Sequence, residues 1–207
     1  MDAPDNVKDR IRSVARDRFF REGFARVLVD DIADDLGISK KTFYKHFDSK
    51  EELLRRIIHD TLADVHANIQ QIIASDKGFV EKLDDLMTFL GNTYSLISPL
   101  MMADCHRYLP DLWEAVQKFR RERIARNVRG LILDGIRGGY IREELSVDVF
   151  LAAFIAGVEA VMTPSFLSNH PVDGRQALRS FMTIFFQGIL TDPARTQLST
   201  IQRTANQ

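Results

Sequence analysis

The segment LVDDIADDLGISKKTFYKHFDSKEELL, residues 28–54, constrains the fold of this chain more than any other part. Ile32, Ala33 and Leu36 fall on one face at helical spacing. Gly37 follows directly and can end that helix, because glycine takes the left-handed conformation without a Cβ clash. The pattern predicts a short amphipathic helix that ends in a sharp turn.

A second short helix is predicted immediately after this turn. Ser39 is placed to cap its start, and Phe43 and Phe47 turn one side of it inward. Ser49 is placed to cap a further helix. The other side of the second helix is polar or basic apart from one aromatic ring, and it consists of Lys40, Lys41, Thr42, Tyr44, Lys45 and His46. This arrangement is a helix-turn-helix whose second helix suits the major groove of DNA.

The order of motifs extends beyond this segment. An amphipathic helix over residues 11–20 precedes Gly23-Phe24, and then follow D-D-I-A-x-x-L-G-I-S, T-F-Y-x-x-F and S-K-E-E-L-L. This order resembles the TetR family of bacterial repressors over about the first 55 residues, whereas the rest of the chain matches only in length and helical character. The resemblance implies a homodimer that binds a palindromic operator in double-stranded DNA and is released by a small-molecule effector.

The resemblance assigns roles to residues of the second helix. Lys40, Lys41 and Thr42 match positions that face base edges, where a lysine can donate to guanine and a threonine methyl can pack on thymine. Tyr44, His46 and Lys50 match positions that contact or approach phosphates. A tyrosine hydroxyl and a lysine at the start of a helix are suited to bind phosphate oxygens. The predicted DNA-binding set is Ser39, Lys40, Lys41, Thr42, Tyr44, Lys45, His46 and Lys50. The alternative is that the lysines form an ordinary solvated face.

Two departures from the family pattern bear on the strength of DNA binding. Leu28 stands where the family usually has a threonine, and it can neither cap a helix nor bind a phosphate. Asp30 and Asp31 favour the helix dipole but repel a phosphate backbone, so the first helix of the motif is expected to hold DNA weakly. Lys41 stands where a small residue is common, and it is expected to raise affinity or narrow the choice of operator.

Bulk properties exclude several classes of protein. The chain has 207 residues and a formal net charge of −1, so any affinity for nucleic acid must come from local charge. The single Cys105 excludes an internal disulfide and a cysteine-rich metal site, and it fits a reducing cytoplasm. The start is too polar for a signal peptide, and the most apolar run, residues 147–162, is too short to span a membrane. No cofactor is predicted.

We expect an all-α protein of about nine helices in two domains. Residues 1–48 form the helix-turn-helix DNA-binding domain with three helices, and residues 49–207 form a helical domain for effector binding and dimerisation. A long helix from about Ser49 to Ala74 would link the two. The last helix starts near Asp173, and a polar, mobile tail is expected from Asp192.

The second domain offers residues suited to a small, largely apolar or aromatic effector. Aromatic and methionine side chains adapt to irregular ligands, and a few polar groups would orient them. The predicted ligand-binding residues are Leu86, Phe89, Leu90, Tyr94, Met102, His106, Trp113, Phe154 and Glu159, and Met101, Phe119 and Met162 are further candidates. The alternative is that most of these residues belong to the core.

Glu159 lies in an almost wholly apolar predicted helix. A carboxylate there must be paired or neutralised, because burial of an isolated charge is costly. It could bind a ligand amine, or it could pair with an arginine from residues 120–129 or from a second subunit, and we favour the structural pair.

Small residues in the same helix permit close approach of another helix. The resemblance implies that this helix and the last one form a four-helix dimer interface, with Ala153, Gly157, Phe181, Phe185 and Gly188 in contact. The alternative is packing within one chain.

A helical enzyme and a protein-interaction module without DNA binding are the rival classes. Asp104, Cys105 and His106 form the most conspicuous cluster, but adjacent helical residues point about 100° apart, so the thiol and imidazole do not face each other. No catalytic residue is predicted. His59 and His66 share a helical face without further ligands, so no metal site is predicted, and a redox role for Cys105 is a minor alternative.

Overall fold

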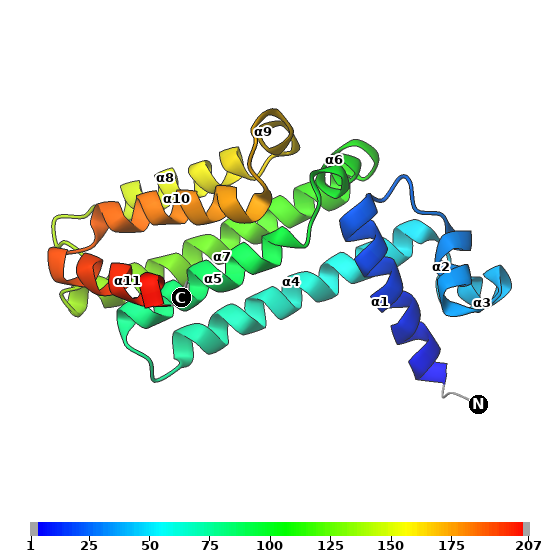
Figure 1. The fold of residues 1–207 in the computed structure, drawn as a ribbon, viewed down its shortest axis with the longest axis horizontal. Helices are drawn as coiled ribbons and strands as arrows, with labels where there is room; N and C mark the ends of the chain where they lie inside the picture. Colours follow the sequence, from blue (N-terminus) through cyan, green and yellow to red (C-terminus); the bar gives the residue numbers. More distant parts are fainter. Residues whose placement is uncertain (1–3, 205–207) are drawn as a thin grey trace. The chain divides into compact units, whose positions relative to one another are not determined.

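A computed structural model describes residues 4–204, apart from the side chains of residues 4–6 and 124. Within this described part the protein has eleven α-helices and no β-strand, and one isolated antiparallel bridge joins Ile141 to Leu190 (Figure 1). The predicted all-α class is therefore confirmed. Every helix in the described part is too short or too polar to cross a membrane.

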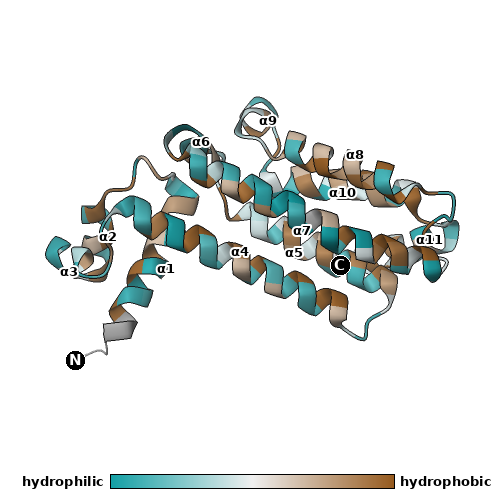
Figure 2. Cartoon of the chain, turned by 180° about the vertical axis from the view of Figure 1, so that it is seen from behind, coloured by the Kyte–Doolittle hydropathy of each residue, from teal (hydrophilic) through white to brown (hydrophobic). Residues whose placement is uncertain are grey.

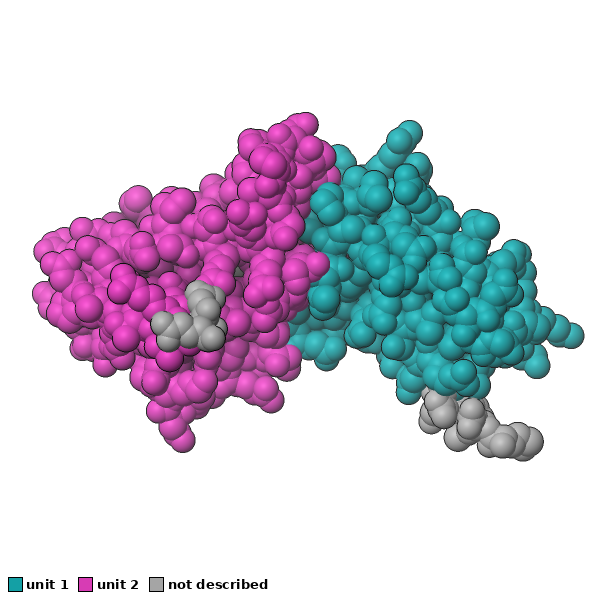
Figure 3. All heavy atoms as spheres, in the orientation of Figure 1, with its two compact units in different colours: residues 1–65, 96–113 teal, residues 66–95, 114–207 magenta. Residues whose placement is uncertain are grey.

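The chain divides into two compact units (Figure 3). Unit 1 comprises residues 1–65 and 96–113, and unit 2 comprises residues 66–95 and 114–207. Helices α4 (Lys50–Ala74) and α7 (Pro110–Arg137) each contribute residues to both units. The sequence suggested a different division, by function, into residues 1–48 for DNA binding and residues 49–207 for effector binding and dimerisation. That division stays a prediction.

The helices have the following bounds. Those at the N-terminal end are α1 (Pro4–Glu22), α2 (Val29–Leu36), α3 (Lys40–Tyr44) and α4 (Lys50–Ala74). The middle of the chain forms α5 (Phe79–Ser95), α6 (Pro99–Tyr108) and α7 (Pro110–Arg137). The remainder forms α8 (Val147–Val161), α9 (Pro164–Asn169), α10 (Gly174–Ile189) and α11 (Asp192–Thr204).

Side-chain caps define where many of these helices begin. In each case an oxygen of the capping side chain accepts a hydrogen bond from the backbone N–H three residues later, which satisfies one of the free donors of the first turn. The capping residues are Ser39, Ser49, Ser98, Ser146, Thr163 and Asp173. The caps predicted at Ser39 and Ser49 are confirmed.

Unit 2 has an aromatic core between α8 and α10. Rings of neighbouring phenylalanines in this core lie 4.4–6.1 Å apart between centroids. The cluster consists of Phe150, Phe154, Phe181, Phe185 and Phe186. Such ring pairs add to the stabilisation that comes from burying their large apolar surfaces.

Two helices in unit 2 were not predicted. Pro164 begins α9, where its missing N–H costs nothing in the first turn. The segment from Asp192, expected to be a mobile tail, forms α11 with Ala194 and Leu198 buried. Gln202 of α11 donates to the Asp84 carboxylate of α5 at 3.1 Å. The expected count of nine helices was therefore too low.

Candidate DNA-binding interface

The turn between α2 and α3 has the geometry that its sequence dictates. Gly37 has φ +63°, and the backbone N–H groups of Gly37 and Ile38 donate to carbonyls of the last turn of α2 at 3.1 and 3.0 Å. Ser39 Oγ then accepts from the Thr42 N–H at 3.0 Å. Because a single residue, Ile38, separates the left-handed Gly37 from the Ser39 cap, α3 begins three residues after Gly37.

The buried side of the motif determines which residues face solvent. Phe43 and Ile32 are fully buried, and Phe47 is almost so. They share the core of unit 1 with apolar residues of α1 and of the first turns of α4, namely Ile11, Ala15, Phe19, Leu53, Leu54 and Ile57. Because Phe43 points inward, the lysines around it are directed outward.

The outward side of α3 and of the turn after it is basic. Lys40, Lys41 and Lys45 are exposed, and Tyr44 is 46% exposed although it is a large aromatic residue. The ammonium groups of Lys41 and Lys45 make no hydrogen bond or ion pair with other described residues, whereas Lys40 Nζ lies 3.1 Å from an Asp30 carboxylate oxygen. This side can offer free cationic donors and a phenolic hydroxyl to an anion.

The other predicted DNA-binding residues are less free. Thr42 and His46 are half-buried, and the Thr42 hydroxyl shares a 2.9 Å hydrogen bond with that of Ser39. Lys50 is half-buried, and its Nζ donates to the backbone carbonyls of Phe24 and Val27, both at 2.8 Å. Each assignment to DNA stays a prediction.

Lys50 joins the start of α4 to the loop between α1 and α2. Its Nζ also lies 4.2 Å from the centre of the Phe24 ring. Burial lowers the pKa of Lys50, although the nearby carboxylates of Glu51, Asp104 and Asp31 raise it. The ammonium therefore fixes the entry to α2 as well as lying near the predicted DNA face.

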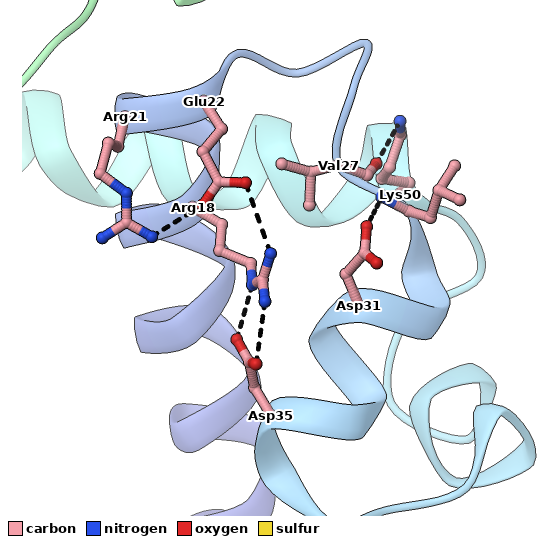
Figure 4. A network of polar contacts seen from close by, with 8 residues as sticks. Arg18, Arg21, Glu22, Val27, Asp31, Asp35 and Lys50 are labelled. Carbon is pink, nitrogen blue, oxygen red and sulfur yellow. Dashed lines mark hydrogen bonds and ion pairs between the residues drawn. The ribbon is translucent and has the colours of Figure 1, made fainter.

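Polar contacts also fix α2 against α1 (Figure 4). Arg18 of α1 donates to both carboxylate oxygens of Asp35 at 2.6 and 2.9 Å, and this pair lowers the pKa of Asp35. At the start of α2, the Leu28 N–H donates to Asp31 Oδ2 at 2.8 Å. As predicted, the Leu28 side chain does not cap α2, and Asp31 binds the backbone in its place.

Helix α6 braces the loop between α1 and α2 from within unit 1. Asp104 Oδ2 accepts from the Ala25 N–H at 2.7 Å, and the Ser98 N–H donates to the Phe20 carbonyl at 2.7 Å. Gly23 has φ +90°, which strains any other residue, and an added Cβ would lie 2.8 Å from Asp104 Oδ2 and force this carboxylate to shift. Sequence reasoning missed these contacts, since no local pattern links residues 79 positions apart.

The predicted effector residues in unit 1 lie on α6 and at the start of α7. Met102 is buried, His106 is exposed, and Trp113 is half-buried. The rings of His106 and Trp113 meet edge to face at 5.6 Å. Cys105 is buried, and this burial raises the pKa of its thiol to about 11, which disfavours the reactive thiolate.

The predicted effector residues in unit 2 have different environments. Leu86 is buried on α5, Phe154 belongs to the phenylalanine cluster, and Phe89, Leu90 and Tyr94 are half-buried. Glu159 is also half-buried, and its Oε1 accepts from Arg121 at 2.9 Å. The pairing of Glu159 with an arginine from residues 120–129 is therefore confirmed, while a role in ligand binding stays a prediction.

The predicted dimer residues divide between the surface and the interior of unit 2. Ala153 and Gly188 are exposed, whereas Phe181 is buried and Phe185 half-buried in the phenylalanine cluster. A Cβ added to Gly157 would lie 2.3 Å from the Phe181 ring. Gly157 therefore permits close packing of α8 on α10 within one chain, which was the alternative noted for these small residues.

Comparison with known proteins identifies the same N-terminal region. The sequence model described as "Bacterial regulatory proteins, tetR family" matches residues 11–57. The HTH-type transcriptional repressor KstR2 of Mycolicibacterium smegmatis is 26% identical over 190 residues, which cover 90% of this chain and 92% of that protein.

Solved structures share the fold along most of the chain. The ketosteroid transcriptional regulator KstR2 of Mycobacterium tuberculosis has a TM-score of 0.60 and 21% identity, and the match covers 90% of this chain and 96% of that one. A TetR-family transcriptional regulator from Agrobacterium tumefaciens has a TM-score of 0.69 and 18% identity, with coverage of 91% and 100%.

Proposed function

The chain belongs to the TetR family of DNA-binding transcriptional regulators, and from this premise we propose that it is a homodimeric repressor of a palindromic operator, released by a small-molecule effector. Membership of this family makes the chain a regulator of transcription and not an enzyme. The assignment rests on the N-terminal motif and the full-length relatives, and it does not depend on an absence of catalytic groups.

The observation that carries the proposal is the basic outward side of α3. Lys41 and Lys45 present ammonium groups that pair with no described residue, and the exposed Tyr44 presents its hydroxyl on the same side. In a helix-turn-helix the second helix enters the major groove, where lysines can donate to guanine N7 and O6 or to phosphates. Lys40 would have to leave Asp30 to reach DNA, since the two are paired at 3.1 Å.

Two helix-turn-helix domains are needed to bind the two half-sites of an operator, which lie about 34–36 Å apart, so the proposal includes a dimer. Exposed residues of α8 and α10 supply a surface for it. Ile184 is 71% exposed and Val149 68% exposed, and exposed alanines lie on the same side of α8 as Val149. Those alanines are Ala152, Ala153, Ala156 and Ala160. A small-residue and apolar surface of this kind suits contact with a second copy.

The effector would act by binding one arrangement of the protein better than another. Helix α4 runs from Lys50, beside the predicted DNA face, to Ala74 in unit 2, so it is the element that could carry a change between them. The half-buried apolar side chains Phe89, Leu90 and Tyr94 support an effector with an apolar body. A solved relative is described as a ketosteroid regulator, which also supports this.

Selection of duplexes from a random DNA library tests the proposal. The wild type should enrich one sequence with two-fold symmetry, and Lys41→Ala should change the preferred bases because Lys41 is assigned to base edges. Lys118→Ala, which removes an exposed lysine from unit 2, is the matched control and should enrich the wild-type sequence. Failure of the wild type to enrich any sequence would reject the proposed function.

A further inference from the structure

Unit 2 contains buried polar atoms that have no hydrogen-bond partner among the described residues. They are Nδ1 of His66 on α4, and Oε1 of Gln117 and Nη1 of Arg120 on α7. Gln117 and Arg120 are three residues apart, so they share a face of α7. Unpaired buried polar atoms are costly, and they commonly indicate that a ligand or water completes the site.

The charges around these atoms are not balanced. Arg121 and Arg129 on the outer side of α7 pair with Glu159 and Asp148, respectively. No carboxylate of the described residues pairs with Arg120, whose guanidinium lies 5.3 Å from the centre of the Tyr94 ring. An arginine that lies over an aromatic ring and pairs with no carboxylate among the described residues keeps its charge available for an anion.

His66 does not neutralise this charge. The imidazole Nε2 lies 3.1 Å from Arg123 Nη1, which donates to it. Burial lowers the pKa of His66, and the nearby Arg123 and Arg126 lower it further. Because Nε2 accepts from Arg123, the imidazole is the neutral tautomer that carries its proton on Nδ1, the atom without a partner among the described residues. The site thus offers a cation and a neutral donor.

Apolar side chains on α4, α5 and α7 are incompletely covered. On α4 no described side chain beyond Ile57 is buried, and Ile69, Ile72 and Ile73 are half-buried. Tyr94 of α5 and Phe119 of α7 are also half-buried. Figure 2 shows the mixture of hydrophobic and hydrophilic residues along α4. A half-buried aromatic ring beside the Arg120 cation, with half-buried apolar side chains on the same helices, suits a molecule with an apolar body and an anionic end.

We propose that the effector site of unit 2 takes a carboxylate with an apolar tail, and that Arg120 binds the carboxylate with His66 and Gln117 beside it. This inference rests on the proposed function, because it specifies the effector class of the same regulator. It also modifies the expectation of a largely apolar effector by adding one negative charge. A carboxylic acid end could use the Gln117 oxygen, and a carboxylate could use Arg120 and the His66 N–H.

Competing ligand classes fit less well. An ammonium end would be repelled by Arg120 and Arg123, and a hydroxyl end would leave the guanidinium without a counter-charge. Because a charge-assisted hydrogen bond is stronger than a neutral one, the carboxylate should bind about tenfold or more tightly than the alcohol of the same chain length. This ratio is the measurable consequence of the proposal.

Calorimetric titration of the full-length protein with decanoate, 1-decanol and decylammonium tests it. The wild type should bind decanoate most tightly, and Arg120→Gln should bind decanoate and decanol equally. Arg120→Lys, which keeps the charge, should retain part of the preference. Arg121→Gln is the matched control, because it removes the adjacent arginine on the outer side of α7 and should keep the full preference. Thermal melting of each variant establishes that it is folded.

Three outcomes would overturn the inference: no preference for decanoate in the wild type, no binding of any decyl probe, or a preference that survives Arg120→Gln in a folded protein. A separate measurement tests the proposed function. If decanoate binds with the expected preference but leaves affinity for the selected DNA unchanged, the carboxylate site stands and the release of DNA by this site is rejected. If the protein selects no DNA at all, the repressor role fails while the titration still decides the chemistry of the site.

Discussion

At the scale of single residues, Lys50 shows how a contact with residues far away in the sequence can change the interpretation of a side chain. Its position in the sequence, at the start of a helix next to a basic motif, indicates a phosphate contact. The fold adds two backbone carbonyls, from Phe24 and Val27, as acceptors for its ammonium group. One of the three N–H donors of the ammonium group is left for a phosphate, so Lys50 can both stabilise the helix-turn-helix and contact DNA.

We predict that Lys50→Met lowers the free energy of unfolding by about 1–3 kcal/mol, because two backbone carbonyls lose a charged donor. Denaturant unfolding followed by circular dichroism measures this change. Lys45→Met is the control, since Lys45 is exposed and its ammonium makes no hydrogen bond or ion pair with described residues. It should leave the unfolding midpoint unchanged. A midpoint for Lys50→Met equal to that of the wild type would show that the two carbonyl contacts contribute nothing.

At the scale of helices, local signals predicted the helix-turn-helix correctly. The left-handed Gly37 and the caps at Ser39 and Ser49 are properties of a few consecutive residues, so the sequence reveals them. Helix α11 was missed because its polar composition resembles a tail, and the two residues that hold it, Ala194 and Leu198, are buried only after the chain has folded.

The pair α8 and α10 illustrates the same limit for the dimer. Small residues in α8 indicated close helix packing but not its partner. The structure shows that Gly157 faces Phe181 of the same chain, so a substitution there would disturb the core of unit 2 before it disturbed a dimer. The dimer is better tested at exposed residues, of which Ile184 is 71% exposed.

Ile184→Arg should therefore convert the proposed dimer to a folded monomer. Placing an unpaired charge in an apolar interface is costly, and obligate interfaces of this type bury upward of roughly 2,000 Å². Light scattering during size-exclusion chromatography at micromolar concentration measures the mass. Thr88→Arg, at an exposed position of α5, is the control and should remain dimeric. A monomeric wild type, or a dimeric Ile184→Arg, would contradict the dimer assigned to this surface.

At the scale of the whole molecule, the sequence predicted the all-α class and the helix-turn-helix but not the chemistry of the effector. The helix-turn-helix lies in one continuous segment. Its caps at Ser39 and Ser49, its turn residue Gly37 and its buried Phe43 and Phe47 lie within 30 residues of one another. The candidate effector site takes His66 from α4, Tyr94 from α5 and Arg120 from α7. Helix periodicity cannot show which residues of separate helices meet, so the unpaired arginine emerged only from the structure.

The central claim is that this chain recognises one DNA sequence with two-fold symmetry. Fluorescence anisotropy at fixed salt, with the selected duplex and with the same duplex scrambled in one half-site, tests it most directly, since salt alone changes the affinity of any DNA-binding protein. We expect saturation at two protomers per duplex and at least about a hundredfold weaker binding to the scrambled duplex. Equal affinity for the two duplexes at the same salt concentration would contradict the claim.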